Sequence, residues 1–304
     1  NLPKFRAKQI IEWLYQKHAT SFDEMTNLSK DLREKLAQEF TIERAKSCDR
    51  LDSSDGKTTK FLLEFGDGIG VETVLMRQPY GNSICVSSQA GCNMGCSFCA
   101  STLHGMARNL STGEILAQAM FIQELLNQTG EQINNIVIMG SGEPMDNYDN
   151  VVKFLGLINS DKGLNISQRN ITVSTCGLVP RIKQLAELKL QITLAISLHA
   201  PNDELRKTMM PIAYTYSIEQ IMDACRYYLS QTARRISFEY SLVKGVNDSP
   251  ECARQLIKLV HGMNCHINLI PVNPIKERDY EQSEKNSIHN FKEIKCSIKL
   301  VKML

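Results

Sequence analysis

Three cysteines fall within eight consecutive positions of the stretch AGCNMGCSFCA, residues 90–100. Cys92, Cys96 and Cys99 follow the spacing Cys-x3-Cys-x2-Cys. Thiolates are soft ligands that suit zinc or iron–sulfur clusters. A structural zinc site takes four protein ligands, for which His104 is a nearby candidate. A [4Fe–4S] cluster held by three cysteines instead leaves one iron free for an outside ligand. The triplet therefore predicts a metal centre, and it favours an iron–sulfur cluster over zinc.

The composition of the chain limits where such a centre would work. Ten cysteines occur in 304 residues, and the chain opens on an amphipathic segment of mixed charge that is not an export signal. We therefore expect reduced thiols in the cytoplasm. No run approaches the ~20 apolar residues needed to cross a bilayer, so we expect no membrane association. The net charge of +2 neither requires nor excludes a nucleic-acid partner.

Apolar, β-branched runs recur along most of the chain, with helix-like segments between them. This alternation predicts a parallel sheet with crossover helices, built either as an open barrel or as a doubly wound sheet. In both folds, ligands gather at the carboxyl ends of the strands, and the cysteine triplet follows the first strand. The expected strands cover residues 83–89, 134–140, 170–177, 191–199, 235–245 and 266–273.

The segments before this series have a different character. Residues 1 to about 45 show helical periodicity, and Ser29 is a candidate cap for the second helix. The stretch TTKFLLEFGDGIGVETVLM carries two β-rich runs around glycines, which predicts a hairpin. Further along, Ser111 and Glu114 have the spacing of a capping box at the start of a helix. We divide the chain into a helical domain (1–46), a hairpin linker (47–77) and an α/β core (78–304).

The triplet, with Phe98 before its third cysteine, resembles the signature of radical S-adenosylmethionine (SAM) enzymes. In those enzymes the methionine end of SAM chelates the free iron, and an electron from the cluster cleaves SAM to a 5′-deoxyadenosyl radical. Further motifs are similar to the RlmN branch of the RlmN/Cfr family, from about residue 4 to about residue 294. They are FRAKQIIEWLYQK, SFDEMTNLSKDLREKL, CVSSQAGCNMGCSFCA, RNLSTGEI, MGSGEPMDN, SLHAPNDELR and NLIPVNP.

The resemblance implies a fold and an activity. The fold is an α/β, partial (β/α)6 radical SAM barrel, preceded by a small helical domain and a β-hairpin. The activity is methylation of adenine C2 in 23S rRNA and in tRNA through a methyl-cysteine intermediate, because C2 is not nucleophilic enough for ordinary methyl transfer. The implied cofactors are a [4Fe–4S] cluster and SAM. A monomer that receives electrons from a flavodoxin or ferredoxin completes this expectation.

The resemblance also implies roles for individual residues. Cys92, Cys96 and Cys99 correspond to the cluster ligands. Glu72 corresponds to the proton-accepting glutamate, and Cys85 to a cysteine that takes part in the reaction. The implied SAM contacts are Gly142, Glu143, Ser174, Ser197, Leu198, His199 and Asn273, each at the end of an expected strand.

The last residues depart from the family pattern. The methyl-carrying cysteine of the family lies in a C-terminal segment resembling DIDAACGQL, whereas this chain ends in KCSIKLVKML. The context of Cys296 does not match, so we expect a chain that binds the cluster and SAM but does not complete methylation. Three alternatives remain open: a Cfr-type adenine C8 methyltransferase, an activase that forms a radical on a protein glycine, and an inactive remnant that binds SAM and RNA. The helical N-terminal match favours C2.

Overall fold

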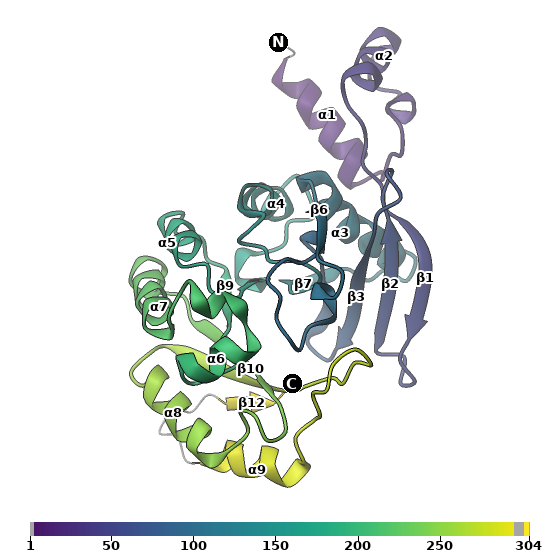
Figure 1. Cartoon of the computed structure of the whole chain (residues 1–304). Coiled ribbons are helices and arrows are strands. Elements are labelled where there is room, and N and C mark those ends of the chain that lie inside the picture. Colours follow the sequence, from purple (N-terminus) through teal and green to yellow (C-terminus); the bar gives the residue numbers. More distant parts are fainter. Residues whose placement is uncertain (1–2, 295–300, 304) are drawn as a thin grey trace. The chain divides into compact units, whose positions relative to one another are not determined.

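The computed structural model of the chain describes residues 3–294 and 301–303 (Figure 1). Its residues form two compact units, which are described separately here. Unit 1 contains residues 1–90, 108–141 and 147–171, and unit 2 contains residues 91–107, 142–146 and 172–304. The domain boundaries expected at residues 46 and 77 stay predictions.

Unit 1 begins with a small helical module. It contains α1 (Lys4–Tyr15), the 3-10 turn η1 (Phe22–Glu24) and α2 (Lys30–Glu39). Ser29 precedes α2 as expected, although its side chain makes no capping hydrogen bond. Met25 and Leu28 lie before α2 in the chain. They are buried nonetheless, because the module builds its own small core around them.

The strands of unit 1 run in the order β1-β2-β3-β4-β7. The expected hairpin is confirmed by β2 (Thr58–Glu64) and β3 (Gly70–Gln78), which pair antiparallel. An additional strand, β1 (Lys46–Asp52), pairs with β2 and was not expected. β4 (Gly81–Cys85) and β7 (Ile133–Ile138) are the first parallel pair.

Two helices complete the unit, α3 (Thr112–Asn127) and α4 (Tyr148–Asn159). The capping box of α3 is confirmed, because the Ser111 Oγ accepts the Glu114 amide at 3.2 Å.

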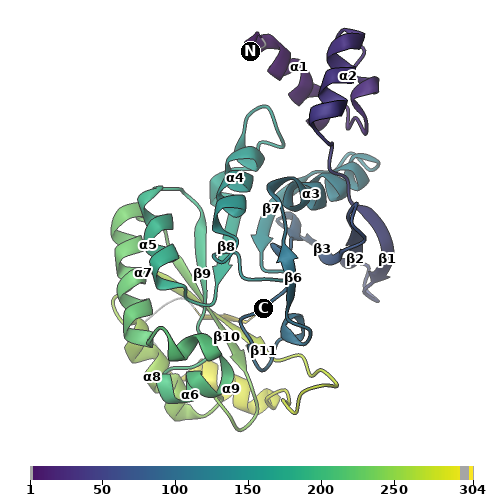
Figure 2. The same cartoon turned by 45° about the horizontal axis from the view of Figure 1, so that its top comes forward.

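The strands of unit 2 run in the order β8-β9-β10-β11-β12, and each adjacent pair is parallel. Helices follow the strands, and α5, α7 and α8 lie along the outer side of this sheet (Figures 1 and 2). The strands are β8 (Ile171–Thr175), β9 (Thr193–Ser197), β10 (Ile236–Leu242), β11 (Cys265–Pro271) and β12 (Val301–Met303). The helices are α5 (Val179–Glu187), α6 (Asp203–Met209), α7 (Ile218–Thr232), α8 (Pro250–Val260) and α9 (Lys285–Glu293).

The two faces of β10 differ in chemistry, although every residue of the strand is buried. One face carries Phe238 and Tyr240, and the Tyr240 ring packs at 5.4 Å from that of Phe291 in α9. Because alternate side chains of a strand point to opposite faces, Ser237, Glu239 and Ser241 lie on the other face. The inner face of this sheet is therefore polar, as the wall of a ligand site would be.

Each of the six expected strands overlaps an observed strand, so the alternating α/β pattern is confirmed. Between β4 and α3 the chain forms two short paired strands, β5 (Gln89–Gly91) and β6 (Met106–Asn109), which were not expected.

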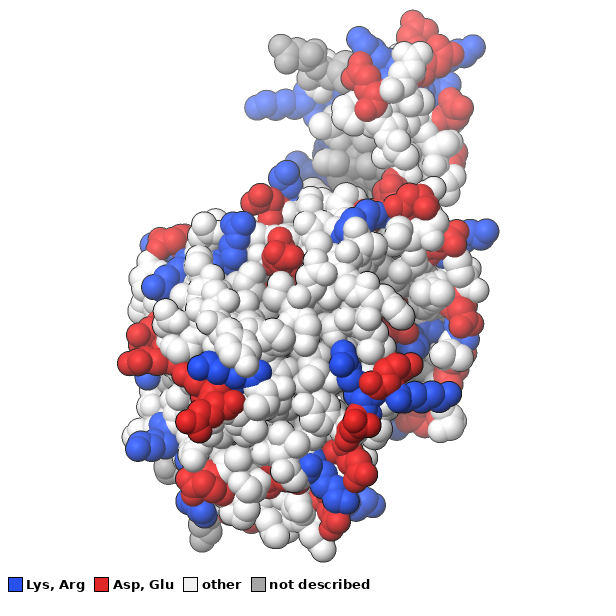
Figure 3. Space-filling view, in the orientation of Figure 1, with Lys and Arg blue, Asp and Glu red and all other residues white. Residues whose placement is uncertain are grey.

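Among the described residues, no helix has the length and apolarity that crossing a membrane would require. Acidic and basic side chains are interspersed over the face drawn in Figure 3, and no basic patch marks it.

Candidate cluster and cofactor site

The three cysteines of the triplet lie in one loop of unit 2, residues 92–105, here called the cluster loop. Cys92 and Cys96 are buried and Cys99 is partly buried. The loop is closed at its base by the Cys92 amide, which donates to the Gly105 carbonyl at 3.1 Å. Gly91, just before it, has φ +78°, and a Cβ there would lie 2.0 Å from the same carbonyl oxygen. Only glycine permits this approach.

The thiols of the triplet are close enough to affect one another. Burial, to which the neighbouring Cys99 adds, raises the pKa of Cys92 to about 11 and that of Cys96 to about 12. The metal-free protein therefore holds Cys92 and Cys96 as neutral thiols at physiological pH. Because ligation requires thiolates, binding of a metal must release their protons.

The number of thiols bears on the choice between a cluster and a single ion. In the part of the chain that the structure describes, no three His, Cys, Asp or Glu side chains are placed to hold one metal ion, and this includes His104. A structural zinc takes four protein ligands, whereas three cysteines suffice for a [4Fe–4S] cluster that leaves one iron free.

Two distant segments fix the position of the cluster loop. The Ser97 amide and Oγ both donate to the Met209 carbonyl at the end of α6, at 2.9 and 3.1 Å. The same Oγ lies 2.8 Å from the hydroxyl oxygen of Tyr280. Pro211 packs against Gly95, at 3.2 Å from where a Cβ would be.

Gly142 and Glu143 follow β7, where the sequence places them. Gly142 has φ +100°, a conformation that suits glycine. The Glu143 carboxylate is buried and accepts two backbone amides, from Cys176 at 2.7 Å and from Met145 at 3.0 Å. Burial raises the pKa of this carboxyl. Glu143 therefore joins the segment after β7 to the end of β8.

The remaining predicted residues of unit 2 lie at the ends of β8, β9 and β11. The Oγ atoms of Ser174 and Ser197 are 3.4 Å apart. The amides of Leu198 and His199 both donate to the Glu239 carbonyl, at 3.1 and 3.2 Å. Asn273 is exposed, two residues beyond β11.

His199 contacts the cluster loop directly. Its Nδ1 accepts the Ser241 amide at 2.9 Å, so the ring carries its proton on Nε2. Burial lowers the pKa of His199 to about 3, so the ring is neutral at physiological pH. The ring meets that of Phe98 edge-on, with 4.7 Å between centroids. Phe98 lies directly before Cys99, so His199 supports the third ligand of the triplet.

Comparisons with known proteins agree with this geometry. The sequence profile of the Radical SAM superfamily matches residues 86–257, and that of the ribosomal RNA large subunit methyltransferase N-terminal domain matches residues 2–42. A protein of Lachnospira eligens, named as a probable dual-specificity RNA methyltransferase RlmN, is 63% identical over 95% of this chain and 82% of its own length. The chain belongs to the RlmN family. A Bacillus subtilis protein of the same name is 53% identical over 94% of this chain and 79% of its own length.

A solved structure extends the match to the fold. The crystal structure of a radical SAM methyltransferase from Sphaerobacter thermophilus is 40% identical and superimposes with a TM-score of 0.94, covering 100% of this chain and 89% of that protein. The expected radical SAM fold is thereby confirmed. Membership of the RlmN family also assigns the two cofactors of the superfamily, a [4Fe–4S] cluster and SAM.

Glu72 and Cys85, to which the RlmN family resemblance gives catalytic roles, both lie in unit 1. Cys85 pairs with Val74 across β3 and β4, and Glu72 lies two residues before Val74, so all three share one face of the sheet. The Glu72 carboxylate accepts the Lys60 Nζ at 2.7 Å. Burial, with a smaller contribution from the charge of Glu72, raises the pKa of Cys85 to about 11.

Sequence reasoning missed several residues of the RlmN-type site. Both polar groups of the Cys176 backbone are bonded. Its amide donates to the Glu143 carboxylate at 2.7 Å, and its carbonyl accepts the Arg206 Nη2 at 2.5 Å. Arg206, Ser97 and Tyr280 were not singled out at all. Only the position of Ser97, inside the triplet, could have indicated a role. Cys296 lies outside the described residues.

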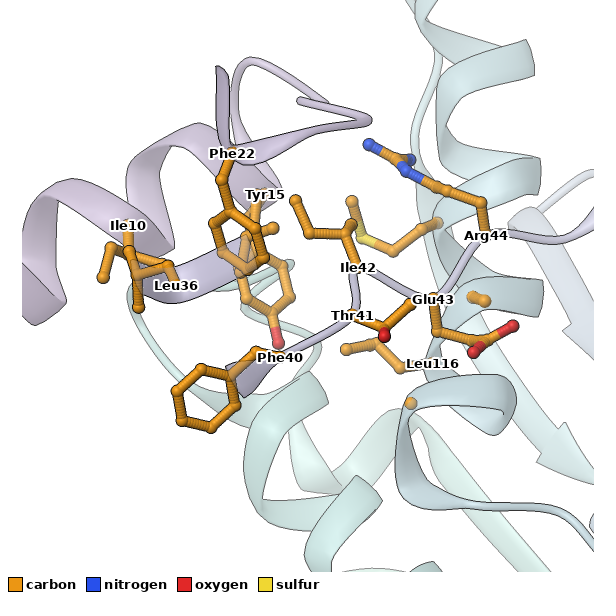
Figure 4. Close-up of a pocket in the computed structure, with 14 residues that line it drawn as sticks. Ile10, Tyr15, Phe22, Leu36, Phe40, Thr41, Ile42, Glu43, Arg44 and Leu116 are labelled. Carbon is orange, nitrogen blue, oxygen red and sulfur yellow. The ribbon is translucent and has the colours of Figure 1, made fainter. Parts of the chain in front are cut away.

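A separate cavity of about 410 Å3 occurs in unit 1, between the helical module and α3 (Figure 4). Its wall is mostly apolar, with Phe22, Ile42 and Leu116 pointing into it and Glu43 at its margin. It contains none of the residues that the RlmN family resemblance singles out.

Proposed function

We propose that this chain carries the catalytic centre for methylating C2 of adenine in RNA by radical SAM chemistry. The observation that carries the proposal is the buried triplet of Cys92, Cys96 and Cys99 in a chain of the RlmN family. The relatives named as dual-specificity RNA methyltransferases support RNA as the substrate class. By the same likeness, 23S rRNA and tRNA are the two substrates.

Cys92, Cys96 and Cys99 are the ligands of the [4Fe–4S] cluster in this proposal. When bound with SAM, that cluster supplies the one-electron reduction that yields a 5′-deoxyadenosyl radical. Gly142 lets the backbone approach the methionine amino group, and Glu143 orients it. His199 contacts SAM in this proposal as a neutral ring, so it adds no charge beside the cofactor. The remaining SAM contacts are Ser174, Ser197, Leu198 and Asn273.

Glu72 and Cys85 are the acid–base and thiol groups of the proposal. Glu72 accepts the proton that leaves the adenine ring, for which its carboxylate must part from Lys60. Cys85 takes part as a thiol, and its raised pKa keeps it protonated until a base is near. The shared face of β3 and β4 supports their joint action.

The free thiols of the chain bear on the compartment in which it works. All nine cysteines within residues 3–294 are free, which supports work in the reducing cytoplasm. We propose a monomer that accepts electrons from a small carrier protein such as flavodoxin or ferredoxin.

The test is anaerobic reconstitution with iron and sulfide, followed by incubation with SAM, dithionite and either a 23S rRNA fragment or tRNA. Mass spectrometry measures 5′-deoxyadenosine and the methylated base. We expect 5′-deoxyadenosine from the wild type and no formation of either product by Cys96→Ala. When the chain is joined to a family C-terminal segment that carries the methyl-bearing cysteine, we expect 2-methyladenine in the RNA as well. In that fusion, Cys85→Ala should retain the cluster and SAM cleavage but lose the RNA product. 8-Methyladenine would favour the Cfr-type reaction instead, and a wild-type chain that forms no cluster would overturn the proposal.

A further inference from the structure

Arg206 is a fully buried cation in the last turn of α6. Its exposed fraction is 0%, and it is among the largest side chains that are completely buried. The guanidinium donates to three backbone carbonyls: Nε to Leu198 at 3.2 Å, Nη2 to Cys176 at 2.5 Å and Nη2 to Ser197 at 3.3 Å. All three acceptors are uncharged, so these bonds orient the cation without neutralising it.

No carboxylate of the described chain completes the pairing of Arg206. Its Nη1 is buried and has no hydrogen-bond partner. The charge of Asp203, one turn earlier on α6, acts on Arg206 through space. Asp203 nevertheless accepts the Ile218 amide at 2.7 Å, and none of the ion pairs found in the described residues involves Arg206. An arginine in a protein does not lose its proton. A buried charge without a directly bonded anion is unfavourable, so a missing anion is expected beside it.

The surroundings of Arg206 indicate which anion this is. Cys176, whose carbonyl it binds, belongs to one apolar cluster with Cys96, Met209 and Met210. α6 ends at Met209, which receives both bonds from Ser97 of the cluster loop. Cysteines bind iron only as thiolates, and three thiolates around a [4Fe–4S]2+ core leave a net negative charge. Among the described side chains, Arg206 is thus a buried cation held against the loop that acquires this charge.

We infer that Arg206 is a positioning residue that balances the charge of the cluster and favours its reduced state. The inference rests on the cluster assigned above to Cys92, Cys96 and Cys99. Reduction adds one electron and no proton to the cluster, so the site becomes more negative by one charge. A fixed buried cation stabilises the more negative state more strongly, because the interaction is barely screened inside the protein.

The experiment measures the midpoint potential of the reconstituted cluster by electron paramagnetic resonance during titration with dithionite, without SAM. Arg206→Gln removes the charge but keeps an amide that can donate to a carbonyl, whereas Arg206→Lys keeps the charge. Arg226→Gln removes an exposed charge of α7 in the same unit and is the matched control. We expect a more negative potential for Arg206→Gln, a smaller change for Arg206→Lys and no change for Arg226→Gln.

A second measurement compares thermal unfolding with and without the cluster. Because the cation lacks a directly bonded anion in the metal-free protein, Arg206→Gln should cost less stability there than after reconstitution. Equal losses in both states would overturn the inference, as would equal potentials for Arg206→Gln and wild type.

Other outcomes are equally decisive. If Arg206→Lys folds but changes the potential as much as Arg206→Gln does, the shape of the guanidinium matters and its charge does not. A shift that appears only when SAM is added would assign the anion to the SAM carboxylate and overturn the inference. If Arg206→Gln fails to fold, the potential of Arg206→Lys, which keeps the charge, must lie close to that of wild type, and a large shift would overturn the inference. A wild-type chain without a cluster would instead refute the proposed function.

Discussion

The Oγ of Ser97 lies 2.8 Å from the hydroxyl oxygen of Tyr280, which joins the cluster loop to the segment after β11. Ser97 stands between the second and third cysteines of the triplet, so this bond bears on the spacing of two ligands. A neutral hydrogen bond contributes about 1 kcal/mol net, enough to change how long a loop stays closed.

We predict that Tyr280→Phe releases iron several-fold faster than wild type when a chelator is added. The ring remains, so the fold should be retained and only the anchor is lost. Iron release is followed by absorbance, with Tyr214→Phe, an exposed tyrosine of the same unit, as the control. Ser97→Ala also removes the bond from Oγ to the Met209 carbonyl, so it should release iron at least as fast. The double variant should be no worse than Ser97→Ala alone. Unchanged release from Tyr280→Phe would refute the role of this bond.

The Cys85 thiol should react slowly with iodoacetamide at neutral pH. Burial raises its pKa to about 11, so the reactive thiolate fraction should grow roughly tenfold per pH unit between pH 7 and 10. Peptide mass spectrometry measures the rate, with the exposed Cys48 as the internal comparison. Because the charge of Glu72 also raises this pKa, Glu72→Gln should speed the reaction. A rate for Cys85 that levels off below pH 9 would contradict the assignment.

Gly113→Ala should stabilise unit 1 by about 0.5 kcal/mol. Gly113 lies in the first turn of α3 beside the cavity, and a Cβ there would meet the Glu43 Cβ at an acceptable 3.4 Å. The gain comes from the lower conformational freedom of alanine in the unfolded chain. Gly140→Ala is the matched comparison, because its Cβ would lie 2.9 Å from the backbone of Val86 and Ser87, and it should destabilise. Thermal unfolding that ranks the two in the opposite order would be inconsistent with this packing.

The stability of Glu239→Gln, measured relative to that of wild type, should increase as the pH rises. Burial raises the pKa of Glu239 in the folded chain, although Ser237 and Asn268 both donate to its Oε1. A carboxyl with a raised folded pKa contributes its full stability below its unfolded pKa, and that contribution falls as the pH passes the folded pKa. Glutamine keeps both bonds and does not ionise.

The measurement for Glu239 is denaturant unfolding at several pH values between 5 and 8. The difference in unfolding free energy between Glu239→Gln and wild type should move in favour of the variant across this range. Glu219→Gln, at the exposed start of α7, is the control. If this difference in unfolding free energy stays constant with pH, the pKa of Glu239 is the same in the folded and the unfolded chain, and the prediction is wrong.

The sequence predicted the parallel strands because most are short runs rich in apolar residues between helix-like segments. β9, with the sequence TLAIS, is an example. β1 escaped prediction for the opposite reason. Its residues are almost all exposed, so an edge strand such as KSCDRLD shows no apolar alternation. The pair β5 and β6 is only three and four residues long, too short to show a period.

The predicted site residues were found by motif, whereas the missed ones depend on tertiary structure. Arg206 lies in DELRK, a charged stretch that is typical of an exposed helix, yet α6 packs it against the ends of β8 and β9. Tyr280 meets Ser97 across 183 residues of sequence. No local pattern can indicate a partner at that separation.

The chain enters unit 2 for two short passages, at residues 91–107 and 142–146, before it stays there from residue 172 onward. The first passage contains the three cysteines and the second contains Glu143. A gene fragment that begins at residue 172 would therefore encode most of the strands and helices of unit 2 but none of the triplet. During synthesis on the ribosome, the cysteines emerge before the strands and the arginine that will surround them. Iron cannot be enclosed until the later half of the protein has been made.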